Sequence, residues 1–234
     1  MQQYFAKDKE LNLYDSDYHH IKNVMRMKKG DIIKIVYNNI RYTCKVTEIG
    51  NKCKYDVLDQ ESNKNNSIKI TLAFSLIKEQ KQNYLIQKAT EIGVNDFVPV
   101  ETSRTVVKIE NKKIKSKIDR WQRICKESAE QSFRYDVPKI YDIKDLKSID
   151  VSDYDLKILL SLDKNAKNIK KVLQNNTKYD KIILIVGPEG GFTNDEENAL
   201  VEKGFVKASL GSNVLRAETA PLVALSMINY ELMR

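Results

Sequence analysis

The pattern of apolar residues changes at a polar stretch, residues 59–67, and this change constrains the fold more than any other feature. Before it, a short helical stretch near 16–27 is followed by alternating β-branched runs at 31–37, 40–49 and 53–58, which predict antiparallel strands of a small barrel or sheet. After it, apolar runs alternate with helical patterns, which is typical of a mostly parallel sheet covered on both faces. We therefore predict an α/β chain in which a small β-rich domain precedes a larger one.

Beyond the polar stretch, predicted strands and helices follow one another in turn. The apolar runs predict strands at 70–77, 96–100, 156–162 and 181–187. Helical periodicity predicts helices at about 81–92, 114–132, 165–175 and 194–203, and a final helix that begins near Pro221. The helix at 114–132 has Ile118, Trp121 and Cys125 on one apolar face, so we assign Trp121 to the core rather than to base stacking.

Basic residues exceed acidic ones, 40 against 32, and the net charge of +8 suggests a polyanionic partner without identifying it. Nearly all of this excess lies in residues 104–126, which contain nine basic and two acidic side chains. The basic side chains are Arg104, Lys108, Lys112, Lys113, Lys115, Lys117, Arg120, Arg123 and Lys126. This basic run is either a surface for nucleic-acid phosphates or a solvated helix face with its leading loop.

Composition excludes several classes of protein and site. No apolar run approaches the roughly 20 residues of a membrane helix, and the chain begins without the apolar core of a signal peptide. We therefore expect a soluble, cytoplasmic protein. The three cysteines, Cys44, Cys53 and Cys125, have no CxxC spacing, and the two histidines are sequence neighbours, which indicates neither a disulfide scaffold nor a metal site.

A glycine-rich turn, GPEGG at 187–191, links a buried strand to a helix whose start has capping-box spacing, Thr193 followed by Glu196. In an α/β sheet such a turn lies at the carboxyl edge, where ligands bind. The turn contains neither GxGxxG nor GK[ST], and Glu189 with the acids at 195–197 would repel phosphate. It favours a ligand that is cationic or rich in hydroxyl and amino donors; the alternative is a tight turn without a ligand.

A second loop, residues 210–219, has the sequence LGSNVLRAET and precedes the last predicted helix. It contains apolar Val214 and Leu215 in polar surroundings, beside Arg216 and Glu218. Exposed apolar side chains gain little in a loop, so we expect these two to line a pocket or an interface. The alternative for the charged residues is a structural ion pair between Arg216 and Glu218.

Five segments, in this order along the chain, carry a resemblance to a known family: HHIKNVMRMKKGD, QKATEIGVNDFVPV, RWQRICKESAEQSFRYDVP, GPEGGFTNDE and LGSNVLRAETA. Together they resemble the RsmE-type 16S rRNA (uracil-N3) methyltransferases of the SPOUT superfamily, over nearly the whole chain. The resemblance implies a PUA-like β-barrel domain for RNA binding at 1–68 and a SPOUT methyltransferase domain with a C-terminal trefoil knot at 69–234. It also implies a homodimer that uses S-adenosylmethionine to methylate N3 of a uridine in 16S rRNA of the 30S subunit.

The resemblance places the cofactor in three loops: the one after the strand at 156–162 and the two loops described above. The implied cofactor-binding residues are Ser161, Leu162, Gly187, Pro188, Glu189, Gly190, Gly191, Leu210, Gly211, Asn213, Val214, Leu215, Thr219 and Ala220. A turn with Glu189 and no phosphate cradle is compatible with a sulfonium cation. Backbone groups around Leu210 and Leu215 can hold the adenine between apolar side chains.

Two departures from the family pattern concern the RNA. The family usually has Arg where this chain has Asn213, and often a basic residue where this chain has Gln2 and Gln3. The predicted RNA-binding residues are therefore Arg26, Arg104, Lys112, Lys113, Lys115 and Arg134. As catalytic residues we predict Arg216, which could stabilise the uridine anion, and Glu218; Glu189 is a second candidate base.

Two other functions stay open at this point. A ribosome-binding or assembly protein could keep the fold and lose the chemistry, but the intact GPEGG and LRAETA segments count against it. An enzyme acting on nucleotide phosphates is disfavoured by the acidic residues around the glycine-rich turn.

Overall fold

The computed structural model describes residues 1–50, 52–63, 68–175 and 178–232, and its contacts divide the chain into two units. Unit 1 comprises Met1–Asn65 and Lys126–Val137, and unit 2 comprises Asn66–Cys125 and Pro138–Arg234. Helix α3 (Asn111–Gln131) therefore begins in unit 2 and ends in unit 1.

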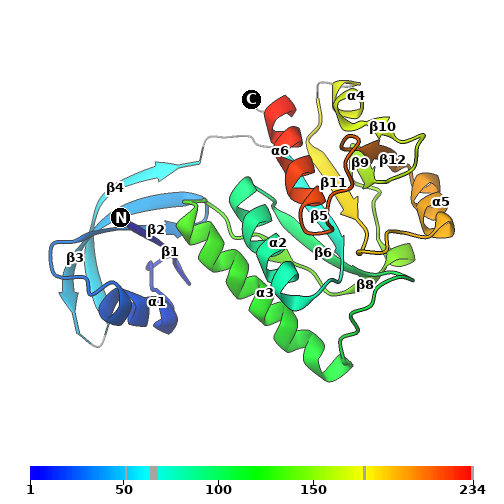
Figure 1. The fold of residues 1–234 in the computed structure, drawn as a ribbon. Coiled ribbons are helices and arrows are strands. Elements are labelled where there is room, and N and C mark those ends of the chain that lie inside the picture. The colour runs from blue at the N-terminus through cyan, green and yellow to red at the C-terminus, as the bar shows by residue number, and fades with distance from the viewer. Residues whose placement is uncertain (51, 64–67, 176–177, 233–234) are drawn as a thin grey trace. The chain divides into compact units, whose positions relative to one another are not determined.

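Unit 1 is built on a sheet with the strand order β1-β2-β3-β4 (Figure 1). Its strands are β1 (Gln2–Phe5), β2 (Ile32–Tyr37), β3 (Ile40–Ile49) and β4 (Cys53–Ser62). The last three pair antiparallel, as predicted, whereas β1 pairs parallel with β2 and was not predicted as a strand. Strand β4 also continues past its predicted end at 58, because its backbone pairs with β3 while its side chains stay exposed and need not be apolar.

The helical stretch predicted near 16–27 is shorter and less regular than expected. It consists of α1 (Asp15–His19) and a π-helical turn, η1 (His20–Val24), and Arg26 beyond it has a left-handed φ of 49°. The Tyr4 hydroxyl and His20 Nδ1 are hydrogen-bonded at 3.0 Å, and Ile21 is fully buried. Ile21 thus fixes the turn to the core of unit 1, while residues 22–24 stay exposed.

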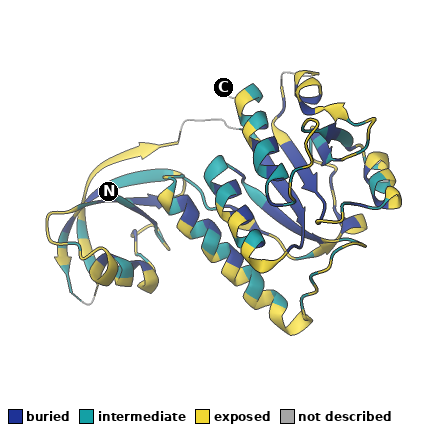
Figure 2. Cartoon of the chain, in the orientation of Figure 1, coloured by how far each residue is buried: buried dark blue, intermediate teal, exposed yellow. Residues whose placement is uncertain are grey.

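Unit 2 contains a sheet with the strand order β10-β12-β9-β11-β5-β6-β7, in which β8 also pairs with β6. Its strands are β5 (Lys69–Ser75), β6 (Asp96–Glu101), β7 (Lys139–Ile140), β8 (Lys144–Asp145), β9 (Leu156–Leu160), β10 (Lys167–Asn168), β11 (Lys181–Val186) and β12 (Val206–Ser209). The pairings among these described strands are all parallel. Successive side chains of β11 point to opposite faces, and Ile182 through Ile185 are all fully buried (Figure 2), so both faces are covered, as predicted.

The helices that complete unit 2 lie close to their predicted positions. Besides α3, they are α2 (Glu79–Ile92), the 3-10 turn η2 (Leu146–Ser148), α4 (Ile169–Gln174), α5 (Asn194–Glu202) and α6 (Ala220–Leu232). Helix α2 ends at Gly93, whose φ of 113° only glycine adopts readily. Helix α4 begins later than the predicted 165, because Lys167 and Asn168 pair with β12 and the Asn168 side chain caps the helix.

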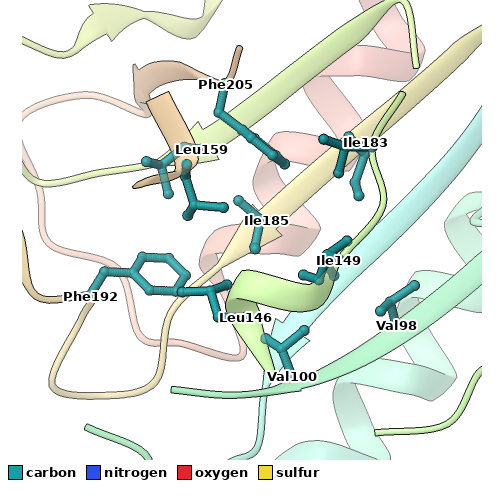
Figure 3. Packing of buried hydrophobic residues seen from close by; sticks show 12 residues of the cluster. Val98, Val100, Leu146, Ile149, Leu159, Ile183, Ile185, Phe192 and Phe205 are labelled. Carbon is teal, nitrogen blue, oxygen red and sulfur yellow. The ribbon is translucent and has the colours of Figure 1, made fainter. Parts of the chain in front are cut away.

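The core of unit 2 on one face of the sheet contains Ile183 and Ile185 of β11, Leu159 of β9 and Val98 of β6 (Figure 3). Elsewhere in this unit, the Trp121 ring meets Phe74 of β5 edge to face, with 6.3 Å between centroids, and is almost completely buried. The assignment of Trp121 to the core is confirmed.

Within the described ranges, no helix is long and apolar enough to span a membrane. The described side chains also include no cluster of three or more His, Cys, Asp or Glu residues that could hold a metal ion.

Candidate functional site

A cavity of about 720 Å³ lies at the carboxyl ends of β9, β11 and β12 in unit 2. Its wall is formed mainly by residues from three segments, 160–163, 186–192 and 208–217. Because the three strands are parallel neighbours in the sheet, the loops that follow them meet at one edge. The topology thus brings together loops that are far apart in the sequence.

Two glycines of the turn after β11 have different structural reasons for lacking a side chain, close packing at Gly187 and backbone conformation at Gly191. A Cβ atom on Gly187 would lie 3.2 Å from the Gly191 carbonyl carbon and from the Phe192 ring. Gly191 has a φ of 66°, and its N–H donates to the Pro188 carbonyl oxygen at 2.9 Å. Gly187 and Gly191 therefore favour the shape of this wall of the cavity.

The predicted capping box at the start of α5 is confirmed. The Glu196 N–H donates to Thr193 Oγ1 at 3.2 Å, and the Thr193 N–H donates to Glu196 Oε2 at 2.8 Å. Glu196 Oε1 accepts a further bond from the Ser103 N–H at 2.7 Å. Although burial raises the pKa of Glu196, these backbone hydrogen bonds outweigh it and hold the pKa below its usual value. The box fixes both the helix start and the loop at 102–105.

Two lysines each bridge a pair of carboxylates around the cavity. Lys207 Nζ lies 2.6 Å from Glu197 Oε2 and 2.9 Å from Asp163 Oδ2, and these hydrogen bonds raise the pKa of Lys207. Lys81 Nζ lies 3.3 Å from Glu218 Oε2 and 3.7 Å from Glu189 Oε1. Each lysine has one positive charge against two carboxylates, so the two bridges balance half of the negative charge of these four acids.

The structure brings the predicted cofactor-binding residues together. All of them line the cavity except Thr219, whose N–H donates to the Arg216 carbonyl oxygen at the start of α6. Ser161 is almost completely buried, and its hydroxyl donates to Glu197 Oε1 at 2.8 Å. Val214 and Leu162 are large apolar side chains that stay mostly exposed at the cavity.

The two predicted catalytic residues are placed differently. Arg216 lines the cavity, whereas Glu218 lies beside it and is buried against Lys81. Among the described residues, no ion pair involves Arg216. The alternative interpretation, a structural Arg216–Glu218 pair, is therefore wrong, because Lys81 takes the place of Arg216 at the carboxylate.

The predicted RNA-binding residues do not form one group. In unit 2, Arg104 donates to the carbonyl oxygens of Gly190 and Phe192 at 2.8 and 3.1 Å and so supports the glycine-rich turn. Lys112 and Lys113 each lie 3.2 Å from Glu110, and Lys115 is exposed on α3.

Unit 1 contains the other two predicted RNA-binding residues. Arg26 is exposed just beyond η1. The Arg134 guanidinium is mostly buried and bonds both carboxylate oxygens of Asp136, at 3.0 and 2.9 Å. Arg134 thus already has an ionic partner in its own turn.

Sequence reasoning missed several residues that line the cavity, of which Lys81, Asp163 and Glu197 carry charge. Lys81 lies in the first turn of α2, directly after the carboxyl end of β5. The rule that βα loops of a parallel sheet meet at one edge could have identified it, since the segment at 70–77 was predicted as a strand.

Comparison with known proteins agrees with this geometry. An RNA methyltransferase domain model matches residues 64–229, and an RNA methyltransferase PUA domain model matches residues 13–54. The ribosomal RNA small subunit methyltransferase E of Bacillus subtilis is 34% identical, over 94% of this chain and 90% of that protein. Its namesake from Mesomycoplasma hyopneumoniae is 32% identical, over 97% of this chain and 98% of that protein.

Solved structures show the same similarity. The crystal structure of a ribosomal RNA small subunit methyltransferase E from Neisseria gonorrhoeae, bound to S-adenosyl methionine, superposes with a TM-score of 0.87. It is 26% identical in sequence, and the match covers 98% of this chain and 97% of that one.

Proposed function

The chain belongs to the RNA methyltransferase family, and from this premise we propose that it transfers a methyl group from S-adenosylmethionine to N3 of a uridine in 16S rRNA of the small ribosomal subunit. One observation carries the proposal: the cavity at the carboxyl ends of β9, β11 and β12 has an acidic glycine-rich turn and exposed apolar side chains. The name shared by the relatives supports small-subunit rRNA as the substrate. The ligand of the Neisseria protein supports the choice of cofactor.

The residues that line the cavity fit this cofactor chemically. Leu162 and Val214 are about three-quarters exposed, and an adenine packed against them would remove apolar surface from water. Glu189 provides a negative charge for a sulfonium cation, and the backbone of 187–191 provides polar groups at close range. When bound, S-adenosylmethionine supplies the electrophilic methyl group.

Arg216 is the residue that we assign to the reacting nucleotide. Uridine N3 becomes nucleophilic when its proton is removed, and the negative charge then spreads over the base carbonyl oxygens. A guanidinium that lines the cavity without an ion pair can stabilise that charge. Of the two candidate bases, Glu189 lines the cavity and Glu218 does not, so Glu189 is better placed to accept the proton.

Incubation of 30S subunits that lack the modification with labelled cofactor, followed by mapping of the labelled nucleotide, tests the proposal. We expect label on one uridine of 16S rRNA, at N3. In Arg216→Ala the rate should fall roughly 10²- to 10³-fold, the cost of removing one preorganised donor, while the protein stays folded and still binds the cofactor. Wild-type turnover by folded Arg216→Ala would refute the assigned role.

We also propose the assembly that the family resemblance implies: RNA binding by a domain at 1–68, a knotted methyltransferase domain at 69–234, and a homodimer in the cytoplasm. The separate matches to residues 13–54 and 64–229 support the division. Light scattering of the purified protein tests the dimer, which should have about twice the chain mass of 27.1 kDa.

The exposed basic side chains Arg26, Lys112, Lys113 and Lys115 are the RNA contacts that we propose on the surface of the two units. Arg104 and Arg134 are bonded within their own loops, and we propose that they shape these loops rather than provide free charge for phosphates.

A further inference from the structure

Lys81 lies at the point where three chemically important segments of unit 2 meet. It comes from the first turn of α2, and its ammonium group approaches Glu189 in the turn after β11 and Glu218 in the loop before α6. Its side chain is 33% exposed and lines the cavity. A single cation therefore connects a helix to the two loops that carry Glu189 and Glu218.

The two carboxylates that Lys81 approaches differ in their need for a cation. The Glu189 side chain is 41% exposed, so water can solvate it. The Glu218 side chain is 12% exposed, and its Oε2 is buried with no hydrogen-bond partner of good geometry, although Lys81 Nζ lies 3.3 Å away. A carboxylate oxygen shielded from water requires a compensating charge, so Glu218 depends on Lys81 more than Glu189 does.

Arg216 lies two residues before Glu218 in the sequence and is a second cation of the same loop. It has no ion pair among the described residues, and it lines the cavity instead. An arginine forms strong, often bidentate pairs with a carboxylate, so Arg216 would compete well for Glu218 if Lys81 were absent. In the structure, Lys81 rather than Arg216 is the cation beside Glu218.

We propose that Lys81 is a positioning residue that holds Glu218 away from Arg216 and so leaves the Arg216 guanidinium available to the reacting nucleotide. The inference rests on the proposed function, since it assumes that Arg216 acts on a substrate. It assigns the Lys81–Glu218 pair a role in catalysis without contact between either side chain and the substrate.

Three variants test this role. In Lys81→Met, Glu218 loses its cation and captures Arg216, so the single-turnover rate of methyl transfer to 30S subunits should fall roughly 10²-fold, as for loss of one donor. Lys81→Arg should keep most of the rate, because a cation stays beside Glu218. In the double variant Lys81→Met/Glu218→Gln, the carboxylate that would capture Arg216 is gone, and the rate should recover by at least about tenfold over Lys81→Met.

Lys207→Met is the matched control, because Lys207 also bridges two carboxylates at this cavity but does not contact Glu218. Addition of Glu218→Gln should not restore the rate of Lys207→Met. Circular dichroism and cofactor titration, which need no activity, establish for each variant that the fold and the cofactor pocket persist.

The outcomes separate this inference from the proposed function. If the wild-type protein does not methylate 30S subunits, the proposed function fails. If the wild type is active and Lys81→Met keeps its rate, or if the double variant is no faster than Lys81→Met, the positioning role is overturned. If Lys81 has a purely structural role, the double variant should be no faster than Lys81→Met, because removing both partners of a structural ion pair restores no catalytic group.

Discussion

Gly187 and Gly190 lie in the same turn but differ in the space around them. A methyl group on Gly187 would meet backbone and an aromatic ring at 3.2 Å, whereas one on Gly190 would meet the flexible Arg104 side chain at 3.4 Å. The glycine-rich character of the turn, which the sequence shows, does not distinguish the two positions. The difference comes from Phe192, which the turn folds back over Gly187.

This difference predicts unequal effects of alanine. Gly187→Ala should lower the free energy of unfolding by about 1–3 kcal/mol, as overpacking does, and weaken cofactor binding because the turn must move. Gly190→Ala should change both quantities by less than half as much. Thermal unfolding and calorimetric cofactor titration measure the effects, and equal losses in the two variants would show that the contact at Gly187 relaxes freely.

At the scale of elements, the C-terminal turns of α3 are fixed within unit 1 by a group of charges, of which Asp17 is buried and Lys126 and Glu130 are partly buried. Lys126 Nζ lies 2.6 Å from Asp17 Oδ1 and 2.7 Å from Glu130 Oε1, and the Phe5 N–H donates to Glu130 Oε1 at 3.2 Å. Burial raises the pKa of Glu130 to about 6, even though Lys126 opposes the shift. Helix α3 is thus bonded to the element that begins the chain, β1.

The raised pKa predicts a pH dependence for this contact. The folded chain holds the Glu130 proton more tightly than the unfolded chain, whose pKa is near 4.5, so the stabilisation is complete below about pH 4.5 and is lost as the pH rises through about 6. The loss should be on the order of 2 kcal/mol, since one pKa unit is worth about 1.4 kcal/mol.

Amide hydrogen exchange of β1 and β2 measures this effect within unit 1. Between about pH 4.5 and pH 6.5, the opening free energy of these strands should fall more in the wild type than in Glu130→Gln, which cannot ionise. Glu127→Gln is the control, because Glu127 lies on the same helix outside this group of charges and should keep the wild-type profile. Identical pH profiles for the wild type and Glu130→Gln would contradict the prediction.

Sequence reasoning missed short strands such as β1 and β10 and the exposed half of β4. The apolar periods of β11, α2 and α6 predicted these elements well, because each buries a continuous face. In contrast, β10 is a two-residue edge strand with exposed side chains, and the exposed half of β4 is polar. Such segments pair through N–H and C=O groups that every sequence has, so periodicity does not reveal them.

At the scale of the whole molecule, individual loops of the candidate site could be predicted from the sequence, but the contacts between residues of different segments could not. Two of the loops that line the cavity could be identified from glycine content and from apolar residues in a polar loop, as at Val214. The approach of Lys81 to Glu218 could not, because it depends on β5 lying next to β11, and strand order is a property of the folded chain. The ion pair joins two residues that are far apart in the sequence, so no local sequence pattern predicts it.

The structure also changes the meaning of the basic run at 104–126. Lys117 and Arg120 both pair with Glu79, at 2.8 and 2.6 Å, and Lys126 pairs with Asp17 and Glu130 in unit 1. Part of the charge that the sequence concentrates in this run is therefore balanced by acids from other segments. The exposed part that could attract a polyanion is centred on Lys112, Lys113 and Lys115.

If these three lysines bind RNA phosphates, their charge must appear in the salt dependence of binding. In Lys112→Glu/Lys113→Glu/Lys115→Glu, RNA affinity should fall, and the log–log slope against salt concentration should flatten by roughly one unit for each phosphate that the variant no longer neutralises. Lys112 and Lys113 share Glu110, so a total change below three units is expected. Filter binding of a 16S rRNA fragment across a salt series measures it.

A second triple Lys→Glu variant with the same change in net charge shows whether the effect on RNA binding depends on where the lysines lie. Lys167→Glu/Lys170→Glu/Lys171→Glu alters exposed lysines at the other end of unit 2's sheet order, on β10 and α4. Exposed charges more than about 10 Å from a phosphate are largely screened at 0.1 M salt and release no counterions on binding, so this control should keep both the affinity at that salt concentration and the slope close to those of the wild type. Equal slopes for the two triple variants would mean that the run at 104–126 is a solvated helix face, and that RNA is held by other surfaces.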